Sequence, residues 1–257
     1  RLEAAGLVEL VGQAGERDPL AHREALDAPE HGLAGEQREA LDAIMALPPG
    51  GELLLQGVAA SGKTDVYLGA VRATLASGRG AIVLVPEVTL IPQLADRLRA
   101  VVGERLAVLH SALSAGERHD EWWRILRGDA RVVVGTRTAA FAPLDAGLIV
   151  IDEEHDGAYK SDRTPRYDAR WVARGRAVAL GARLVLGSAT PDLVTIARVR
   201  GGYAESARLL QRRVGGTPEI EVVDMRAELA GGNRSMFSAP LASALDGLER
   251  GAAQAVQ

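Results

Sequence analysis

Cysteine is absent from this 257-residue chain, which also has few lysines and no long apolar segment. Without cysteine the chain can form neither a disulfide nor a cysteine-ligated zinc site. No apolar run reaches the roughly 18 residues of a membrane helix, and no stretch reads as a signal peptide. We therefore expect a cytoplasmic protein with no membrane partner. The formal net charge of -4 gives no overall sign of nucleic-acid binding, so such a function requires a local patch.

Lysine is scarce, since only Lys63 and Lys160 are lysines among the 30 basic residues. Lys63 lies in GVAASGKT, Gly57 to Thr64, which matches G-x-x-x-x-G-K-[ST] at every fixed position. A compact ammonium on a flexible stem reaches a β- or γ-phosphate where a planar guanidinium fits poorly. Random order at this composition gives roughly 0.002 matches per chain. We therefore interpret the run as a phosphate-binding loop.

The loop predicts a site for a nucleoside triphosphate with Mg²⁺. Its glycines let backbone N–H groups approach phosphates, and the Thr64 hydroxyl is placed for Mg²⁺. The expected nucleotide contacts in and beside the loop are Gly57, Ala60, Ser61, Gly62, Lys63, Thr64 and Asp65. Gln37, 26 residues before Lys63, is expected to pair with N6 and N7 of adenine through its amide. The alternative for Gln37 is an exposed helix glutamine.

A second motif, IDEEH, ends an apolar strand and places carboxylates 89 residues beyond Lys63. Asp152 is expected to hold Mg²⁺, partly through water, and Glu153 to orient and polarise the attacking water. Lys63, Asp152 and Glu153 are thus the candidate catalytic residues. The alternative, a solvated acidic turn, fits poorly after a buried strand.

A third motif, GSAT, closes another apolar strand. The hydroxyls of Ser188 and Thr190 suit a relay between the nucleotide and a substrate, because they can bond both the carboxylates and a moving neighbour. Taken alone, the tetrapeptide is a weak signal, and a plain turn before Pro191 is the favoured explanation. Its value comes from the order of the three motifs, each at the end of its own strand.

The stretch from Asp156 to Trp171, DGAYKSDRTPRYDARW, interleaves aromatic and basic residues. Bases stack on rings and arginine planes while cations follow the phosphates, so we expect contact with single-stranded DNA. The side chains concerned are Tyr159, Lys160, Arg163, Arg166, Tyr167, Arg170 and Trp171. The alternative is a solvated loop entering a helix, with Trp171 packed on the core.

Another strand end, VGTRTAAFAP, supplies two further candidates for DNA contact. Thr136 and Arg137 are expected to contact backbone phosphates. Glu87 repels phosphate, so we expect it to orient Arg137 or another cation.

Short Val-, Leu- and Ile-rich runs alternate with amphipathic helical segments from about Gly51. This pattern predicts an α/β fold, a doubly wound, mostly parallel sheet with helices on both faces and active residues at the carboxyl ends of the strands. Expected helices include 63–77, 114–128 and 168–181. Towards the end of the chain we expect a strand over 219–225, a helix over 239–251 and the start of a strand after it.

Together these motifs resemble the first motor lobe of a superfamily 2 helicase, and more closely the primosomal replication-restart helicases. The resemblance is carried by GVAASGKTDVYL, LVPEVTLIPQ, LHSALSAGER, VGTRTAAFAP, IDEEHDGAYKSDRTPRYDAR and LGSATP. It implies a RecA-like P-loop NTPase in which ATP hydrolysis drives 3′-to-5′ movement on forked or single-stranded DNA. Primosome and helicase-loader proteins are the implied partners, at the nucleoid. The loop holding Tyr159 and Tyr167 would couple DNA to the ATP site.

The resemblance also divides the chain. Residues 1–31 would be the end of a winged-helix-like domain and a linker, 32–218 the ATP-binding lobe, and 219–257 an inter-lobe strand with the truncated start of the second lobe. A chain that begins with Arg1 is expected to be a piece of a longer protein. Zinc is expected only in the missing second lobe. The middle of the phosphate loop, VAAS, departs from the Thr-Gly pair of many members, and we expect little effect.

Two alternatives remain beside the replication-restart interpretation. One is another superfamily 2 DNA translocase, against which the aromatic-basic stretch argues. The other is a non-catalytic DNA-binding scaffold, which would have no need of the acidic pair. Because the resemblance places the arginine fingers in the missing second lobe, the isolated piece is expected to bind ATP weakly and hydrolyse it very slowly.

Overall fold

The computed structural model describes residue 19 and residues 32–212 and 220–254, with the backbone alone over 249–254. The chain forms two compact units, 1–215 and 216–257. The expected boundary at 218/219 and nearly all of the segment assigned to a winged-helix-like domain and linker lie outside the described residues. No helix among the described residues has the length and apolar character needed to cross a membrane.

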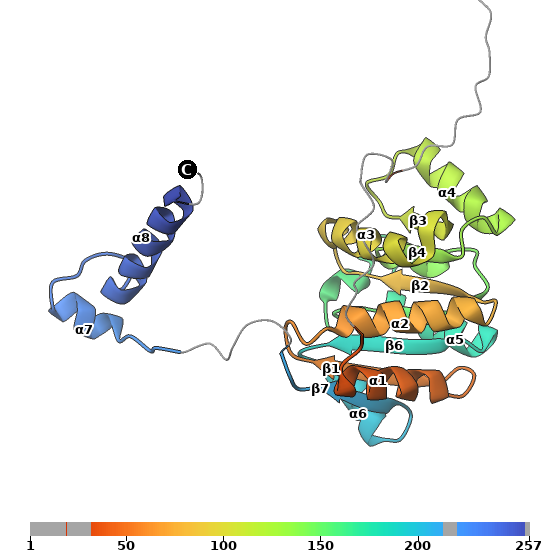
Figure 1. The fold of residues 1–257 in the computed structure, drawn as a ribbon, viewed down its shortest axis with the longest axis horizontal. Coiled ribbons are helices and arrows are strands. Elements are labelled where there is room, and N and C mark those ends of the chain that lie inside the picture. The colour runs from red at the N-terminus through yellow and green to blue at the C-terminus, as the bar shows by residue number, and fades with distance from the viewer. Residues whose placement is uncertain (1–18, 20–31, 213–219, 255–257) are drawn as a thin grey trace, which may run out of the picture. The chain divides into compact units, whose positions relative to one another are not determined.

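The larger unit is built on a seven-stranded sheet in which every strand pair is parallel (Figure 1). In spatial order the strands are β3 (Leu106–Leu109), β4 (Val132–Gly135), β2 (Gly80–Leu84), β5 (Ala146–Ile151), β6 (Arg183–Ser188), β1 (Glu52–Gly57) and β7 (Glu205–Leu209). The expected doubly wound sheet is confirmed. The edge strand β7 was not predicted, because ESARL is short and lacks the continuous apolar run of a buried strand. In the structure it is largely exposed.

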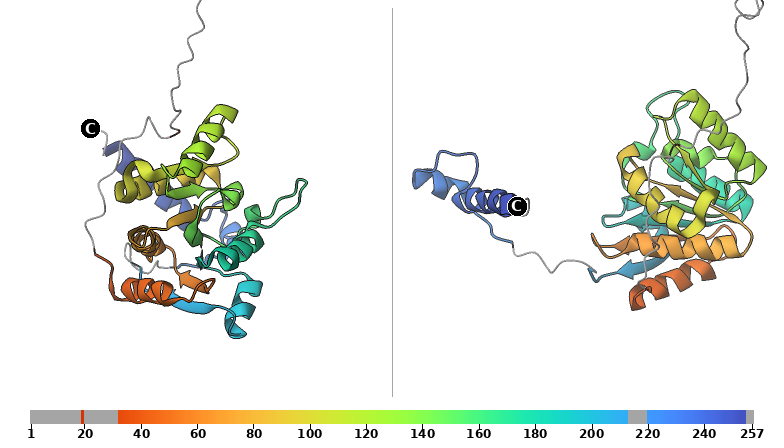
Figure 2. Two further views of the ribbon diagram at one scale, coloured as in Figure 1. Left: turned by 90° about the vertical axis from the view of Figure 1, so that its right-hand side faces the viewer. Right: turned by 45° about the horizontal axis from the view of Figure 1, so that its top comes forward.

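Helices cover both faces of this sheet and close one apolar core on each. The first core includes side chains of α1 (Gly35–Ala46), α2 (Lys63–Ala76) and α3 (Ile91–Val102), and the second those of α4 (Ala115–Arg127) and α5 (Ala169–Leu180). The unit also contains α6 (Leu193–Arg200) and the short turns η1 (Val88–Leu90), η2 (Gly103–Arg105), η3 (Arg137–Phe141) and η4 (Gly157–Tyr159). Figure 2 gives two further views of this arrangement.

Capping explains why the helices end where the sequence predicts. Ser114 begins α4 with a capping box, in which its hydroxyl accepts from Glu117 N at 3.2 Å and Glu117 Oε2 accepts from Ser114 N at 2.8 Å. Gly128 and Gly181 end α4 and α5 in the left-handed conformation, with φ of 83° and 60°. The expected helices 114–128 and 168–181 are confirmed.

The smaller unit corrects two expectations near the end of the chain. Residues 220–224 are not a strand, because the Asp224 side chain accepts from Arg226 N at 2.9 Å and so starts the helix α7 (Met225–Ala230). The helix α8 (Ala239–Gln254) continues through Ala252, where a new strand was expected. Alanine and glutamine favour a continuing helix, whereas a strand requires a paired neighbour.

Candidate functional site

The three motifs meet at the carboxyl edge of the sheet. The phosphate loop follows β1, the acidic motif follows β5 and GSAT ends β6, and these strands are neighbours in the order β5-β6-β1. Because all three strands are parallel, their carboxyl ends lie at one edge. The predicted convergence is therefore present in the fold.

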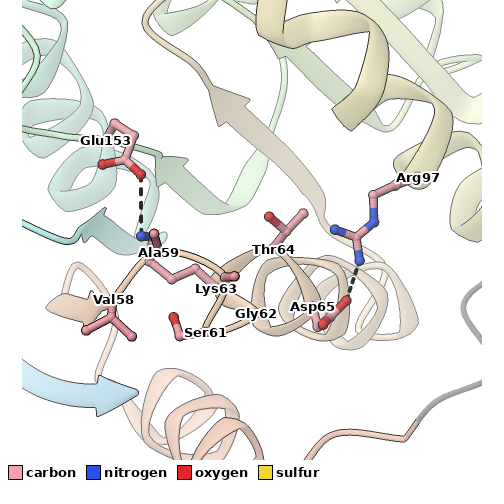
Figure 3. A pocket seen from close by; sticks show the side chains of 10 residues that line it. Val58, Ala59, Ser61, Gly62, Lys63, Thr64, Asp65, Arg97 and Glu153 are labelled. Carbon is pink, nitrogen blue, oxygen red and sulfur yellow. Dashed lines mark hydrogen bonds and ion pairs between the residues drawn. The ribbon is translucent and has the colours of Figure 1, made fainter. Parts of the chain in front are cut away.

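The phosphate loop forms one wall of a cavity of about 540 Å³, shown in Figure 3. Lys63 Nζ donates to Gly57 O at 3.0 Å and lies 3.4 Å from Glu153 Oε1 across the cavity. Gly62 takes φ of 84° and begins α2, so the first free N–H groups of the helix face the loop. This arrangement of backbone N–H groups and an ammonium suits a bound phosphate chain.

Two features of the loop were not apparent from its motif. Ala60 has φ of 60°, in the left-handed region where a Cβ costs about 1–2 kcal/mol, so alanine at this position carries a backbone strain. Ser61 Oγ is buried and has no hydrogen-bond partner among the described residues. Arg97 of α3 also lines the cavity and pairs with Asp65, which holds the start of α2 against α3.

Gln37 lies beneath the loop rather than on an exposed helix face. It is 2% exposed, and its Nε2 donates to Ser61 O at 3.3 Å and Gly62 O at 3.1 Å. Its Oε1 accepts from Ala34 N at 2.9 Å. The amide is thus used by the protein backbone in this structure, and pairing with adenine stays a prediction.

Glu153 lines the nucleotide cavity, and Asp152 precedes it directly after the end of β5. Asp152 Oδ1 accepts a hydrogen bond of 2.9 Å from the Tyr67 hydroxyl. Burial raises the pKa of Asp152, against the opposing effects of this hydrogen bond and the Lys63 charge. Glu153 takes φ of 45°, an uncommon backbone conformation for a residue with a side chain and one found at functional sites.

The donors at this edge fit Mg²⁺. The ion prefers oxygen ligands and usually keeps several waters, binding through one or two carboxylates and substrate phosphates. The Asp152 carboxylate and the Thr64 hydroxyl offer such oxygens, and no group of three or more His, Cys, Asp or Glu side chains in the described part forms a closed metal cage. The residues therefore match a metal shared with a nucleotide.

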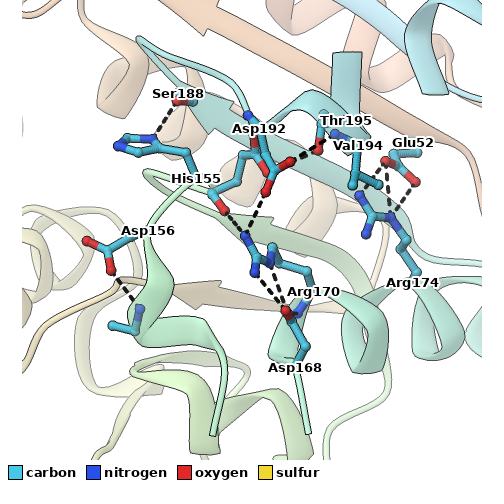
Figure 4. Close-up of polar contacts among 12 residues, drawn as sticks. Glu52, His155, Asp156, Asp168, Arg170, Arg174, Ser188, Asp192, Val194 and Thr195 are labelled. Carbon is cyan, nitrogen blue, oxygen red and sulfur yellow. Dashed lines mark hydrogen bonds and ion pairs between the residues drawn. The ribbon is translucent and has the colours of Figure 1, made fainter. Parts of the chain in front are cut away.

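Glu154, the next residue of the same motif, points away from the cavity and is fully buried. Its carboxylate accepts from Asp192 N at 2.7 Å and from Thr195 Oγ1 at 3.0 Å, and Figure 4 labels these two partners at the start of α6. Ser188 at the end of β6 lies 2.8 Å from His155 Nδ1 and accepts from Thr190 N at 3.0 Å. The acidic motif and GSAT are therefore joined by side chains as well as by strand pairing.

Two of the side chains predicted to contact DNA make bonds within the protein. Tyr159 is 0% exposed, and its hydroxyl donates to Leu84 O at 3.1 Å and Asp152 O at 2.5 Å, so its ring cannot stack on a base. Arg170 is engaged by Asp168 at 2.7 Å, by Asp192 at 3.4 Å and by the Glu154 carbonyl at 2.9 Å. Burial excludes stacking of a base on Tyr159 in this conformation, whereas Arg170 is paired but partly exposed and its contact with DNA stays a prediction.

Other predicted DNA contacts lie on the surface. Lys160 and Arg166 are exposed on the loop, which closes by a backbone bridge between Lys160 and Asp168. Tyr167 is half-buried and packs edge-on against Phe141, with ring centroids 5.0 Å apart. Trp171 is 59% exposed, so the alternative that it packs on the core is wrong.

The two residues after β4 are arranged differently from each other. Thr136 is buried, and Arg137 is half-buried and donates to Ala158 O at 3.0 Å. That bond ties Arg137 to the start of the stretch from Asp156 to Trp171, the aromatic-basic loop. Glu87 is exposed and accepts from Thr89 Oγ1 at 3.1 Å, and no hydrogen bond or ion pair of the described residues joins it to Arg137.

A phosphate loop, an acidic pair and a hydroxyl-bearing strand end on one parallel sheet define a RecA-like P-loop NTPase lobe. Residues 35–199 match the DEAD/DEAH box helicase family, and the chain belongs to that family. It is 45% identical over 237 residues to "Replication restart protein PriA" of Bacillus subtilis (strain 168), covering 90% of the chain and 29% of that protein. The protein of the same name in Synechocystis is 45% identical over 234 residues, covering 88% and 28%. The chain thus spans less than a third of these relatives.

Solved structures support the fold. The chain resembles RecG bound to a three-way DNA junction with a TM-score of 0.53 and 22% identity, over 74% of the chain and 25% of RecG. It resembles the Hef helicase domain of Pyrococcus furiosus with a TM-score of 0.50 and 22% identity, over 68% of the chain and 37% of Hef. The expected RecA-like helicase fold is confirmed.

Functional residues missed in the sequence are Tyr67, Arg97 and Glu154. Tyr67 follows Lys63 by four residues on α2, so helical spacing was available to place it near the loop. Glu154 was visible in the motif, but no pattern distinguishes its inward direction from that of Glu153. Arg97 lies on α3, and nothing in its spacing from the loop indicates their contact.

Proposed function

We propose that this chain is the ATP-binding lobe of an ATP-dependent DNA helicase of the replication-restart primosome, moving 3′ to 5′ on DNA at stalled forks. The observation that carries the proposal is the cavity between the phosphate loop and Glu153. The residue before Glu153, Asp152, accepts through its carbonyl from the Tyr159 hydroxyl and so anchors the aromatic-basic loop beside that cavity. The similarity to replication restart proteins supports the biological setting.

In the proposed mechanism, the backbone N–H groups of the phosphate loop and the Lys63 ammonium hold the phosphates. Glu153 would orient and polarise the attacking water, while Thr64 and Asp152 would hold Mg²⁺, partly through water. The bound ion supplies neutralisation of charge on the phosphate oxygens. An arginine from the second motor lobe is required to complete the site, and the isolated lobe should therefore turn over very slowly.

DNA is proposed to contact the exposed side of the aromatic-basic loop. Lys160 and Arg166 supply cations, and the Phe141–Tyr167 pair supplies an aromatic surface of which Phe141 is 48% exposed. Tyr159 and Arg170 anchor the loop to the ATP site. Primosome and helicase-loader proteins are the proposed partners of the whole protein, which would act in the cytoplasm at the nucleoid, with zinc only in its second lobe.

The first test is the ATPase activity of the full-length protein with and without forked DNA. We expect DNA to stimulate hydrolysis and Lys63→Ala to lower it by ~10²–10³-fold, since a preorganised charge on the transferred phosphate is lost. Wild-type protein without ATPase activity, in the presence of bound DNA, would favour the non-catalytic scaffold. An unchanged rate in Lys63→Ala would exclude the motor function.

The second test concerns the DNA contact. Phe141→Ala is expected to weaken binding of single-stranded DNA roughly 5- to 150-fold, because each stacked base contributes ~1–3 kcal/mol. Trp123→Ala is the matched control, since Trp123 is 46% exposed on α4. An abasic oligonucleotide should bind Phe141→Ala and wild type equally. An equal loss on the abasic strand would rule out stacking.

A further inference from the structure

The hydroxyl of Tyr67 lies where the three motifs of the nucleotide site meet. Tyr67 is on α2, one helical turn beyond Lys63. Its side chain is only 1% exposed, and its hydroxyl donates the 2.9 Å hydrogen bond to Asp152 Oδ1. The hydroxyl is therefore a buried donor whose acceptor is the Asp152 carboxylate.

Gly187, the first residue of GSAT, leaves the space that this hydroxyl occupies. A Cβ built on Gly187 would lie 1.6 Å from the Tyr67 hydroxyl oxygen and 3.3 Å from Asp152 Oδ1. Any side chain there would displace Tyr67. The Gly187 carbonyl also accepts from Glu154 N at 2.9 Å, so the backbone cannot easily move away. Glycine is required here by the approach of the tyrosine.

We propose that Tyr67 is a positioning residue that holds the Asp152 carboxylate in the orientation that receives Mg²⁺. The inference rests on the proposed ATPase function. Mg²⁺ requires nearly octahedral geometry, so a carboxylate that is free to rotate binds it less well. Loss of a hydrogen-bond partner behind a metal ligand typically changes metal affinity or activity by about 10- to 100-fold. The phosphate-loop helix thereby sets the geometry of the acidic motif.

The test uses Tyr67→Phe in the full-length protein and a fluorescent, non-hydrolysable ATP analogue titrated with Mg²⁺. We expect the Mg²⁺ concentration for half-maximal binding to rise about 10- to 100-fold. Affinity for the analogue without metal should stay near that of wild type, because Tyr67 does not line the cavity. A higher Mg²⁺ requirement with an unchanged metal-free affinity for the analogue separates a role in metal positioning from general damage to the site.

Thr74→Val is the matched control. Thr74 is 1% exposed on the same helix, and its hydroxyl donates to Ala70 O at 2.8 Å, at the end of α2 away from the loop. It removes one buried hydroxyl without touching Asp152, so we expect an unchanged Mg²⁺ requirement. If Tyr67→Phe behaved like Thr74→Val, losing only thermal stability, the positioning role would be refuted while the nucleotide function stood.

Gly187→Ala gives an independent check. It should displace Tyr67 and raise the Mg²⁺ requirement in the same direction, and combining it with Tyr67→Phe should add little, because both remove one interaction. Fully additive effects would overturn the proposal. Wild-type protein that bound the analogue with no dependence on Mg²⁺ would refute the proposed function itself.

Discussion

Glu154→Ala is expected to destabilise the larger unit by about 3–5 kcal/mol. The change leaves two donors at the start of α6, Asp192 N and Thr195 Oγ1, without their buried acceptor. Each unsatisfied buried group costs about 1–3 kcal/mol, and hydrogen bonds to a charged acceptor lie at the strong end. The removed carboxylate also lies beside a helix N-terminus, where a negative charge contributes a further ~0.3–1 kcal/mol.

Glu153→Ala is the matched comparison, because the two glutamates are adjacent. The Glu153 side chain is 35% exposed, and the Lys63 ammonium and the His155 ring nitrogen Nδ1 lie 3.4 and 3.7 Å from its carboxylate oxygens. Exposed ion pairs contribute about 0–1 kcal/mol, so this variant should remain nearly as stable as wild type while losing ATP hydrolysis.

Thermal unfolding of the 257-residue chain, followed by circular dichroism, measures the difference. For a unit of this size, 1 kcal/mol corresponds to roughly 2–4 °C, so Glu154→Ala should lower Tm by about 6–20 °C. Glu154→Gln, which can accept from the backbone and donate to Thr195, should lose less. The reasoning is refuted if Glu154→Ala unfolds at the wild-type temperature, or if Glu153→Ala is the less stable of the two.

Three further predictions concern the same edge. Tyr159→Phe should destabilise the chain by about 1–2 kcal/mol in urea unfolding, because two buried carbonyls lose a donor; an unchanged midpoint would contradict its anchoring role. Ala60→Gly should stabilise by up to about 1 kcal/mol, as relief of the positive φ outweighs the added freedom of the unfolded chain; a lower Tm would contradict the strain. Hydrogen bonds from Arg170 lower the pKa of Asp168 despite the opposing effect of burial, so their stabilisation should be lost as pH falls through that lowered value. Asp168→Asn should flatten this acid limb, and an unchanged pH profile would count against it.

The sequence predicted the architecture because most buried strands are continuous apolar runs with motifs at their carboxyl ends. It missed β7, whose residues are mostly exposed and whose strand character depends on pairing with β1. It placed a strand over 219–225 because valines there satisfy strand propensity, whereas the capping bond of Asp224 starts a helix. In both cases a contact outweighed the intrinsic secondary-structure propensity of the segment: strand pairing with β1 for β7, and the Asp224 capping bond for α7.

At the site, residue type and order indicated the phosphate loop and acidic pair but not the direction of each side chain. Tyr159 and Arg170 have the chemistry of DNA contacts, and only the structure shows that Tyr159 is buried and Arg170 is paired with Asp168. Gln37 likewise has a suitable amide for adenine, but in this structure it bonds the loop backbone. Such directions depend on tertiary packing, to which a single sequence gives little access.

The bonds made by Tyr159 and Arg170 support the proposed coupling of DNA to ATP. A base stacked directly on Tyr159 would have to pull its hydroxyl away from the Asp152 carbonyl. With the ring buried, the exposed part of the loop can contact DNA while its two anchors stay fixed, one on Asp152 and the other, through Arg170, on Glu154. DNA that pulls on the exposed part of the loop would then act, through these two anchors, on the backbone of Asp152 and Glu154. Tyr159→Phe should accordingly reduce the stimulation of ATPase activity by DNA more than the affinity for DNA. Equal loss of both would show that the loop acts only as a binding surface.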